Sequence, residues 1–410
     1  MLRGYPGVSW VRVSTPPQNQ GRPDDVTPVR TRPPLGVALA SFASSFDRFA
    51  VSPLLVFVAL DLGVSLAQAV AVAGVYYLAY GFSQPIWGTL ADRFGRVRLL
   101  RWALLGSAVA GLLSAFAPTL ILLVAARAVT GVFFGGIIPT ALTYIGDTVA
   151  ASHRQSALSD LMAGIAVGTA LATATAGLVG DLLSWRVMFA LPPVIAVLCL
   201  LALRRLPEPA RESGGGFVAT LNTALRNRWV WTVVTLAFFE GAAVLGMLTF
   251  LAPALQAQGL DATAAGLTVA GYGVSTMLCS RLVRPLGQRL PITALMLIGG
   301  GAMTLGFALV AVHISVGTVI ASALLLGAAW ALLHTSLQAW ATSVAPAARG
   351  TVVALFAAGL FAGSSVSTLA AGPLVAADAW TTLFAGAALL ALLVTLGAVI
   401  GRRVYDRQER

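Results

Sequence analysis

The sequence predicts an all-α membrane protein whose twelve transmembrane helices form two six-helix bundles related by an internal repeat. Three observations lead to this fold class. Of the 410 residues, 58% are hydrophobic and only 10% are charged, whereas a soluble domain carries about 25% charged residues. Apolar stretches of about 20 residues, the length that crosses a bilayer as a helix, recur along the chain. Finally, motifs of the first half return in the second half at a constant distance.

Twelve apolar stretches are long enough to span a membrane. They cover residues 35–60, 66–91, 99–117, 119–146, 156–180, 186–203, 229–256, 263–280, 290–312, 314–343, 351–376 and 380–400. Residues 1–34 are rich in proline and arginine and lack an apolar run, so we expect a disordered cytoplasmic tail rather than a cleavable signal peptide.

The basic residues predict the orientation in the membrane. All 26 of them are arginine, and they lie almost entirely in alternate loops, with Arg186 as the exception. Loops rich in arginine stay in the cytoplasm, so both termini are expected there, in a multi-pass protein of the cell membrane. Because the arginines form no basic face, no nucleic-acid partner is expected. The absence of lysine and the Ala/Gly/Leu bias point to a bacterial genome of high GC content.

The second half of the chain repeats the first. The segment SWRVMF (184–189) is matched by AWTTLF (379–384), 195 residues later, and Arg154 is matched by Arg349 at the same distance. This predicts an N-terminal bundle over 35–203 and a C-terminal bundle over 229–400. A cytoplasmic linker (204–228) and a C-terminal tail (401–410) complete the chain. Repeats of this kind place the substrate site between the halves, near the bilayer midplane.

A charged motif follows the second span. The stretch GTLADRFGRVR (88–98) resembles the signature loop between helices 2 and 3 of the major facilitator superfamily, and in particular of its bacterial drug and small-molecule efflux members. ARAVTGVFFGG (126–136) resembles the helix 4 motif of that family, and YIGD (144–147) resembles the acidic end of the same helix. The second copy of the signature loop, SRLVRPLGQR (280–289), is degenerate.

The loop residues have a physical use of their own. A glycine on a helix face lets another helix approach closely, and Asp92 can accept hydrogen bonds at a facing helix N-terminus. Arg93 and Arg96 can pair with Asp92 or Asp147. The alternative is a loop that only sets topology. We expect a cytoplasmic latch between the halves made of Gly88, Asp92, Arg93, Gly95, Arg96 and Asp147.

Ionisable residues in the middle of a span are costly and therefore candidates for function. They are Asp47, Arg48, Arg127, Glu240 and His334, on helices 1, 4, 7 and 10, which the resemblance implies line a central cavity. We expect Asp47 and Glu240 to carry protons, with Arg127 controlling the charge of Asp47. Alternatively, Asp47 forms a fixed ion pair with Arg127 or Arg48, and Glu240 is a hydrogen-bonded or rim-facing carboxylate.

Substrate contacts are expected on the same helices. Arg48 and Arg127 could hold an anionic group, although Arg48 could instead snorkel or pair locally with Asp47. Trp330, His334 and Gln338 follow one another at a spacing of four and so share one helix face. This face predicts stacking and hydrogen bonding with substrate. The alternative is a histidine hydrogen-bonded between helices, with a packed tryptophan beside it.

These features together predict proton-coupled efflux of a small amphipathic solute by alternating access, with the proton gradient as energy source and without cofactor or metal. We expect a monomer. Helix 5 carries ATATAG (172–177) where drug antiporters carry a proline motif, and FDRFAVSPLL (46–55) resembles the start of families that move organic anions or lipid-like molecules. A symporter or exporter of such an anion is therefore the alternative. An enzyme is not expected, because the three histidines are scattered; a transport-dead sensor is the remaining alternative.

Overall fold

The computed structural model of the chain describes residues 31–209 and 217–409, and these residues are almost entirely helical. The N half comprises α1 (Leu35–Phe49), α2 (Val51–Asp61), α3 (Leu66–Ala69), α4 (Ala71–Phe94), α5 (Arg96–Ala115), α6 (Leu120–Gly135), α7 (Ile137–Thr148), α8 (Ala151–Leu182) and α9 (Trp185–Ala202). The C half comprises α11 (Arg228–Gly241), η3 (Ala242–Gly246), α12 (Leu251–Ala257), α13 (Ala262–Gly287), α14 (Ile292–Val312), α15 (Val316–Ala329), η4 (Trp330–His334), α16 (Thr335–Ser343), η5 (Pro346–Ala348), α17 (Arg349–Ala370), α18 (Gly372–Ala376) and α19 (Trp380–Gln408).

The predicted spans agree with these helices. Eleven helical segments of the described chain are long and apolar enough to cross a membrane, and the pair α1 and α2, bent by 48°, brings the number to twelve. Several helices extend past the apolar stretch that predicted them: α8 starts at Ala151 and α19 runs to Gln408. Apolar composition marks only the part of a helix inside the bilayer, so it misses the polar turns beyond the membrane.

Proline explains where the spans are broken. A proline clashes with the carbonyl four residues before it and donates no hydrogen bond to that carbonyl. The helices are interrupted at or next to positions 49, 135, 249 and 369. A proline follows each of these positions four residues later: Pro53, Pro139, Pro253 and Pro373. The first, fourth, seventh and eleventh membrane spans are therefore each interrupted. We call these spans helices 1, 4, 7 and 11; they consist of α1 and α2, of α6 and α7, of α11, η3 and α12, and of α17 and α18. Breaks inside a span are tolerated because neighbouring helices supply new partners for the freed backbone groups.

The linker contains secondary structure that the sequence reasoning did not predict. A short turn, η2 (Leu203–Arg205), continues α9, and α10 (Phe217–Arg226) precedes α11. Helix α10 packs on α17 and on η5, and the hydroxyls of Thr220 and Thr351 lie 2.6 Å apart. The predicted disorder of residues 1–34 falls mainly on positions 1–30, which lie outside the described residues.

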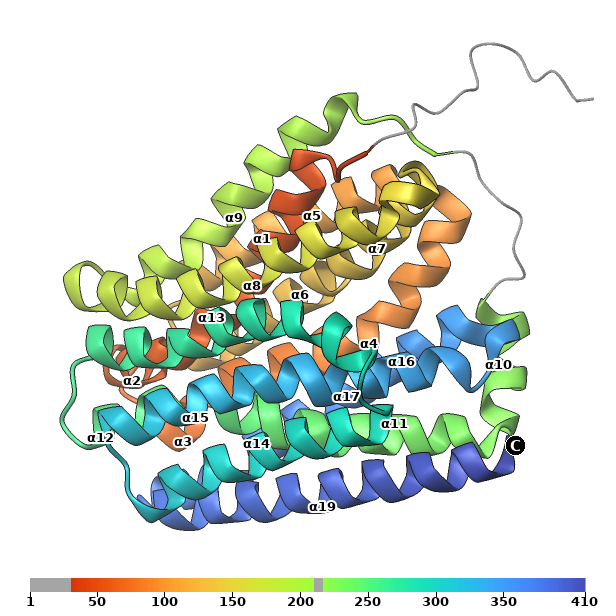
Figure 1. The fold of residues 1–410 in the computed structure, drawn as a ribbon. Coiled ribbons are helices and arrows are strands. Elements are labelled where there is room, and N and C mark those ends of the chain that lie inside the picture. The colour runs from red at the N-terminus through yellow and green to blue at the C-terminus, as the bar shows by residue number, and fades with distance from the viewer. Residues whose placement is uncertain (1–30, 210–216, 410) are drawn as a thin grey trace, which may run out of the picture.

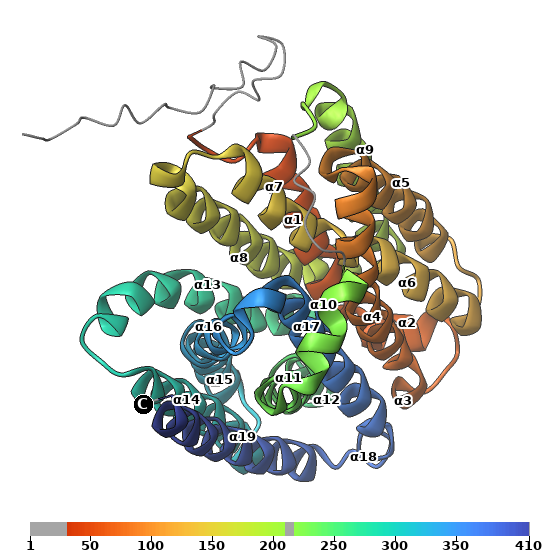
Figure 2. The ribbon, with the colours of Figure 1, turned by 90° about the vertical axis from the view of Figure 1, so that its right-hand side faces the viewer.

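Two long helix pairs join the halves: α8 packs along α13, and α4 packs along α17 (Figures 1 and 2). We call the end of the molecule where α10 lies the linker end, and the opposite end the far end. A Cβ atom added at Gly177 of α8 would come within 2.0 Å of the Ala262 carbonyl oxygen of the C half. Only glycine permits this close approach of the two backbones.

Hydrogen bonds between the halves gather at the far end. The Ser52 hydroxyl donates to the Thr249 carbonyl at 2.8 Å, the carbonyl that Pro253 leaves without its helical partner. Tyr77 and Thr249 lie 3.2 Å apart through their hydroxyls, and the Gln256 side-chain amide donates to the Pro53 carbonyl at 3.1 Å.

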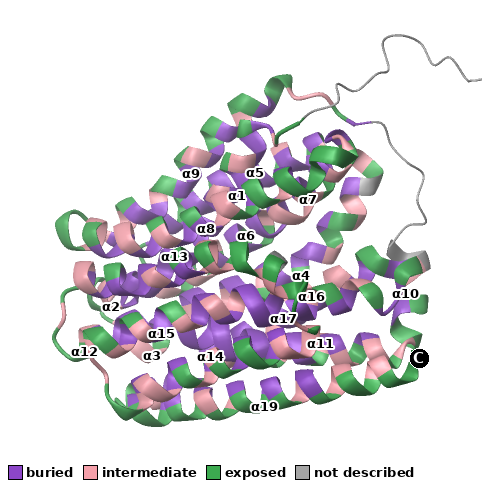
Figure 3. Cartoon of the chain, viewed as in Figure 1, coloured by how far each residue is buried: buried purple, intermediate pink, exposed green. Residues whose placement is uncertain are grey.

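The halves separate toward the linker end. Within the described residues, a Cβ atom added at Gly88 of α4, Gly164 of α8 or Gly350 of α17 would meet no neighbouring atom within 4 Å. The first residues of α8 and the last turns of α13 are largely exposed (Figure 3). The molecule is therefore closed at the far end and open at the linker end.

The outer surface of the bundle is apolar. Large hydrophobic side chains remain exposed there, including Leu113 at 60%, Ile121 at 81% and Val312 at 87%. A soluble protein rarely exposes contiguous apolar surface of this extent, whereas a bilayer solvates it. The exposed positions alternate with buried ones along α9 and α19 (Figure 3), so one face of each helix meets lipid and the other packs inward.

Candidate functional site

A buried ion pair joins α1 to α6 in the N half. The Arg127 guanidinium donates to Asp47 Oδ1 at 2.8 Å and to the Asp47 carbonyl oxygen at 3.4 Å. Both side chains are fully buried, and Arg127 lies over the rings of Tyr76 and Phe189 at 4.3 and 4.9 Å. Of the two partners considered for Asp47 from the sequence, the structure selects Arg127. Asp47 Oδ2 and Arg127 Nε find no hydrogen-bond partner among the described residues.

A second buried acid–base pair joins α11 to η4 in the C half. Glu240 Oε2 and His334 Nδ1 lie 3.1 Å apart, with the Glu240 side chain 1% exposed. The other carboxylate oxygen, Oε1, has no hydrogen-bond partner in the described part of the chain. The Trp330 ring stacks on the His334 ring at 3.8 Å with an interplanar angle of 11°, and the Phe356 ring lies 5.6 Å from His334. The sequence reasoning did not predict that Glu240 pairs with His334.

The two pairs occupy related places in the two halves. The first pair links α1 to α6, in membrane spans 1 and 4. The second pair links α11 to η4, in spans 7 and 10, which are the corresponding spans of the repeat. Glu240 lies two residues before the π-helical turn η3, and His334 ends the π-helical turn η4. Such turns add a residue to the helix and often occur at functional sites. They also rotate the following side chains, so spacing in the sequence does not fix which residues share a face.

Gln338 illustrates this rotation. The sequence places it on the face of Trp330 and His334, but it lies beyond η4, in α16, and is partly buried. Within the described residues no hydrogen bond connects it to either ring. The structure therefore brings Trp330 and His334 into contact, and the described hydrogen bonds do not include Gln338 in that contact.

Arg48 lies between the halves, and the part of the chain that the structure describes offers it no anionic partner. The residue is 9% exposed, and its Nε is buried without a hydrogen bond to any described residue. The guanidinium carbon lies over the rings of Phe49, Tyr80 and Phe361 at 4.9, 5.1 and 5.3 Å. Phe361 belongs to α17 of the C half, so these contacts cross the interface. No sequence signal identified these rings, because helix rotation decides which aromatic side chains meet.

The signature loop makes its described contacts within the N half and with the linker. Arg96 Nε and Asp147 Oδ2 form an ion pair at 3.0 Å, as the sequence suggested. The carboxylate of Glu208, in the linker, accepts hydrogen bonds from the backbone N–H groups of Val97 and Arg98, both at 3.1 Å. Glu208 thus caps the N-terminus of α5, where negative charge is favoured. Gly95 has φ +102°, a conformation that favours glycine.

The predicted helix contact at Gly88 is not present in this conformation, because among the described residues its Cβ position faces open space. Arg93 is exposed and lies over the neighbouring Phe94 ring at 5.4 Å. The Asp92 side chain lies outside the described residues. The latch residues are thus gathered at the linker end, but the described contacts do not connect the two halves.

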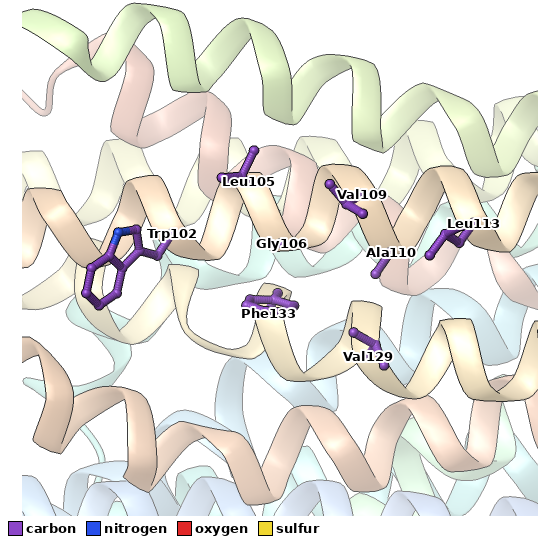
Figure 4. Close-up of a pocket in the computed structure, with 8 residues that line it drawn as sticks. All are labelled: Trp102, Leu105, Gly106, Val109, Ala110, Leu113, Val129 and Phe133. Carbon is purple, nitrogen blue, oxygen red and sulfur yellow. The ribbon is translucent and has the colours of Figure 1, made fainter.

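An apolar hollow of about 370 Å³ lies between α5 and α6, on the outer surface (Figure 4). The residues that line it are Trp102, Leu105, Gly106, Val109, Ala110, Leu113, Val129 and Phe133. Many of these side chains are exposed, as expected for a surface that faces lipid acyl chains. The hollow contains none of the ionisable pairs. Among the described residues, no group of three or more His, Cys, Asp or Glu side chains is arranged to hold a metal ion.

Known proteins share this sequence pattern and this fold. The family model described as Major Facilitator Superfamily matches residues 37–304. The uncharacterized MFS-type transporter YtbD of Bacillus subtilis is 26% identical over 64% of this chain and 66% of its own length. The multidrug efflux pump LfrA of Mycolicibacterium smegmatis is 32% identical over 52% of this chain and 44% of its own. The matched segments span less than two thirds of these relatives.

Two solved structures have similar folds at low sequence identity. The nucleoside transporter NupG superposes with a TM-score of 0.73, at 15% identity, over 88% of this chain and 98% of its own. A bacterial homologue of the human lysosomal transporter Spinster, in an inward-facing and unoccupied conformation, gives 0.72 at 17% identity over 91% and 97%. These relatives and neighbours are transporters rather than enzymes, as the sequence predicted. The chain belongs to the Major Facilitator Superfamily.

Proposed function

We propose that the chain is a proton-coupled exporter of small amphipathic compounds that works by alternating access in the cell membrane. The Glu240–His334 pair is the observation that carries this proposal. When this pair holds one proton it has no net charge, whichever residue carries the proton. When the proton leaves, a single negative charge remains buried, and an uncompensated buried charge costs several kcal/mol. Proton release therefore has to be accompanied by opening to water or by another change in charge.

The Asp47–Arg127 pair behaves differently. It is neutral when Asp47 is ionised, and a proton on Asp47 would leave the buried guanidinium uncompensated. Of the two expected carriers, Glu240 is therefore the better supported, and Asp47 has the role of holding Arg127. We keep Asp47 as a second carrier only for a state in which Arg127 moves away from it.

Alternating access is supported by the asymmetry of the two ends. The arginine pattern places both termini and the linker in the cytoplasm. With that orientation the open linker end faces the cytoplasm, so the structure corresponds to an inward-open state. In the outward-open state we expect Gly88, Asp92, Arg93 and the Arg96–Asp147 pair to meet the C half as a latch. A single chain contains both halves and is the proposed working unit.

A second candidate is transport of an organic anion, and Arg48 favours it. A relative of Escherichia coli named 3-(3-hydroxy-phenyl)propionate transporter is 30% identical over 53% of this chain and 55% of its own length. Efflux of amphipathic compounds is suggested by the relative named multidrug efflux pump LfrA. Both candidates use the same helices, with Arg48 and the Trp330–His334 stack as substrate contacts.

The test uses the purified chain in proteoliposomes that contain a pH-sensitive dye. Under an imposed proton gradient, addition of a transported compound should move protons across the membrane. Glu240→Gln should abolish the proton movement, because it removes the group that holds the proton. Asp160→Asn is the matched control, since Asp160 is an exposed carboxylate on α8. Transport that continues unchanged after the gradient is collapsed contradicts proton coupling, and proton movement that is unchanged in Glu240→Gln contradicts Glu240 as the carrier.

A further inference from the structure

We propose that Arg48 is the binding site for the anionic group of the substrate, and that the substrate class is a small carboxylate with an apolar body. This inference rests on the proposed function for its transport step, but the binding site itself follows from the contacts of Arg48. It commits the transporter to anions rather than to cationic or uncharged compounds.

The hydrogen-bond donors of Arg48 are not all paired within the described residues. A guanidinium has five N–H donors and cannot lose its proton in a protein. Arg48 is more than nine-tenths buried, and its Nε has no partner. Within residues 31–209 and 217–409 no carboxylate forms an ion pair with it. The three aromatic rings attract the cation through their faces, but the two phenylalanine rings carry no hydrogen-bond acceptor, and the Tyr80 hydroxyl lies 3.2 Å from the Ser44 hydroxyl as its partner.

Arg48 also affects the charge balance among the ionisable groups at mid-span. Asp47 and Arg127 cancel each other, and the Glu240–His334 pair is neutral with one proton. Among the five ionisable groups at mid-span, Arg48 is a positive charge without a direct ion-pair partner in the described residues. Such a charge is expensive in a membrane interior. A bound monoanion would cancel it, whereas a cation would add a second positive charge.

The guanidinium of Arg48 and the rings around it indicate the shape of the ligand. Arginine binds planar oxyanions such as carboxylates through two parallel N–H···O hydrogen bonds. Phe49 and Tyr80 of the N half and Phe361 of the C half surround the cation, and they favour an apolar or aromatic group next to the carboxylate. Because Phe361 comes from the other half, the anion would be held where the halves meet.

The experiment measures equilibrium binding to the purified full-length chain without a membrane gradient. The probes are 4-phenylbutyrate, 4-phenylbutanamide and 4-phenylbutylamine, which share one apolar body and differ in charge. The wild-type chain should bind the carboxylate about 10- to 100-fold more tightly than the amide, because hydrogen bonds to charged groups are the stronger ones. The amine should bind weakest. Equal affinity for the carboxylate and the amide, or preference for the amine, overturns the proposal.

Variants then assign the effect to Arg48. Arg48→Met keeps a chain of similar length without charge and should lose the preference for the carboxylate. Arg48→Lys keeps the charge without the two-pronged geometry and should fall between. Arg154→Gln, at an exposed position on α8, should leave the affinities unchanged. Carboxylate preference that survives in Arg48→Met overturns the assignment, and the wild-type comparison decides the substrate class even if that variant fails to fold.

This result is separable from the proposed function. Carboxylate binding that depends on Arg48, without proton movement in proteoliposomes, keeps the binding site and contradicts proton coupling. Proton-coupled transport of the amine or the amide, with no carboxylate preference, keeps the coupling and contradicts the binding site.

Discussion

Removing the Asp181 side chain should shift the molecule away from the state that is closed at the far end, which is the inward-open state in the proposed orientation. Asp181 lies in the last turn of α8 in the N half, and its Oδ2 accepts a hydrogen bond from the Thr263 backbone N–H at 2.9 Å. It also accepts one from the Thr263 hydroxyl. Thr263 lies in the first turn of α13, in the C half. A carboxylate of one half thus caps a helix of the other half at the far end, and this contact is lost if the far end opens.

The size of the effect follows from these contacts. Replacing a capping side chain by alanine costs about 0.5–2 kcal/mol, and a charge at a helix N-terminus contributes about 0.3–1 kcal/mol. Asp181 is exposed, so water screens it and the lower part of these ranges applies. We expect Asp181→Ala to reduce the ratio of inward-open to outward-open molecules by about two- to fivefold. Asp181→Asn keeps an oxygen acceptor and should have a smaller effect.

Distances between spin labels can measure this ratio. Labels at Ser159 of α8 and Ser280 of α13 lie on exposed positions toward the linker end, where the halves separate. The native Cys199 and Cys279 are replaced first, so that only the two introduced cysteines react. In lipid nanodiscs the longer distance reports the inward-open state and the shorter distance the outward-open state. The populations of the two distances give the ratio directly.

Asp61→Ala is the matched control for this experiment. Asp61 is an exposed carboxylate at the same end, but it binds Arg186 at 2.9 Å and the Trp185 indole at 3.1 Å, both within the N half. Its loss should not favour either state. If Asp181→Ala shifts the populations no further than Asp61→Ala, or shifts them toward the inward-open state, the Asp181 contact does not hold the far end closed.

Three further substitutions test other parts of the structure. Gly177→Val places side-chain atoms against the Ala262 carbonyl, so it should prevent far-end closure and enrich the short label distance. Arg127→Gln leaves the Asp47 carboxylate buried without its partner and should cost about 3–5 kcal/mol; the double variant with Asp47→Asn should recover most of that loss in thermal unfolding. Glu208→Ala removes the cap of α5 and should lower stability by about 1 kcal/mol, with a faster cleavage of the linker by added protease.

The sequence predicted the membrane spans and the helices that carry ionisable groups, because burial in lipid demands long apolar runs and makes every interior charge conspicuous. It did not predict which charges meet. Asp47 and Arg48 are neighbours in the sequence, yet successive side chains on a helix point about 100° apart, and only the packing of α1 on α6 decides that Asp47 meets Arg127. The pairing of Glu240 with His334 depends likewise on how α11 and η4 pack together.

The helix interruptions and the far-end contacts have one physical origin. Pro53 and Pro253 break helices 1 and 7, which are related by the repeat, and each break leaves carbonyl groups without a helical donor. The Thr249 carbonyl, four residues before Pro253, receives the Ser52 hydroxyl of the other half. In the outward-open state this carbonyl must find water or another donor, since an unpaired buried carbonyl costs about 1–3 kcal/mol. The proline breaks therefore make far-end closure favourable through the same backbone groups that they leave unpaired.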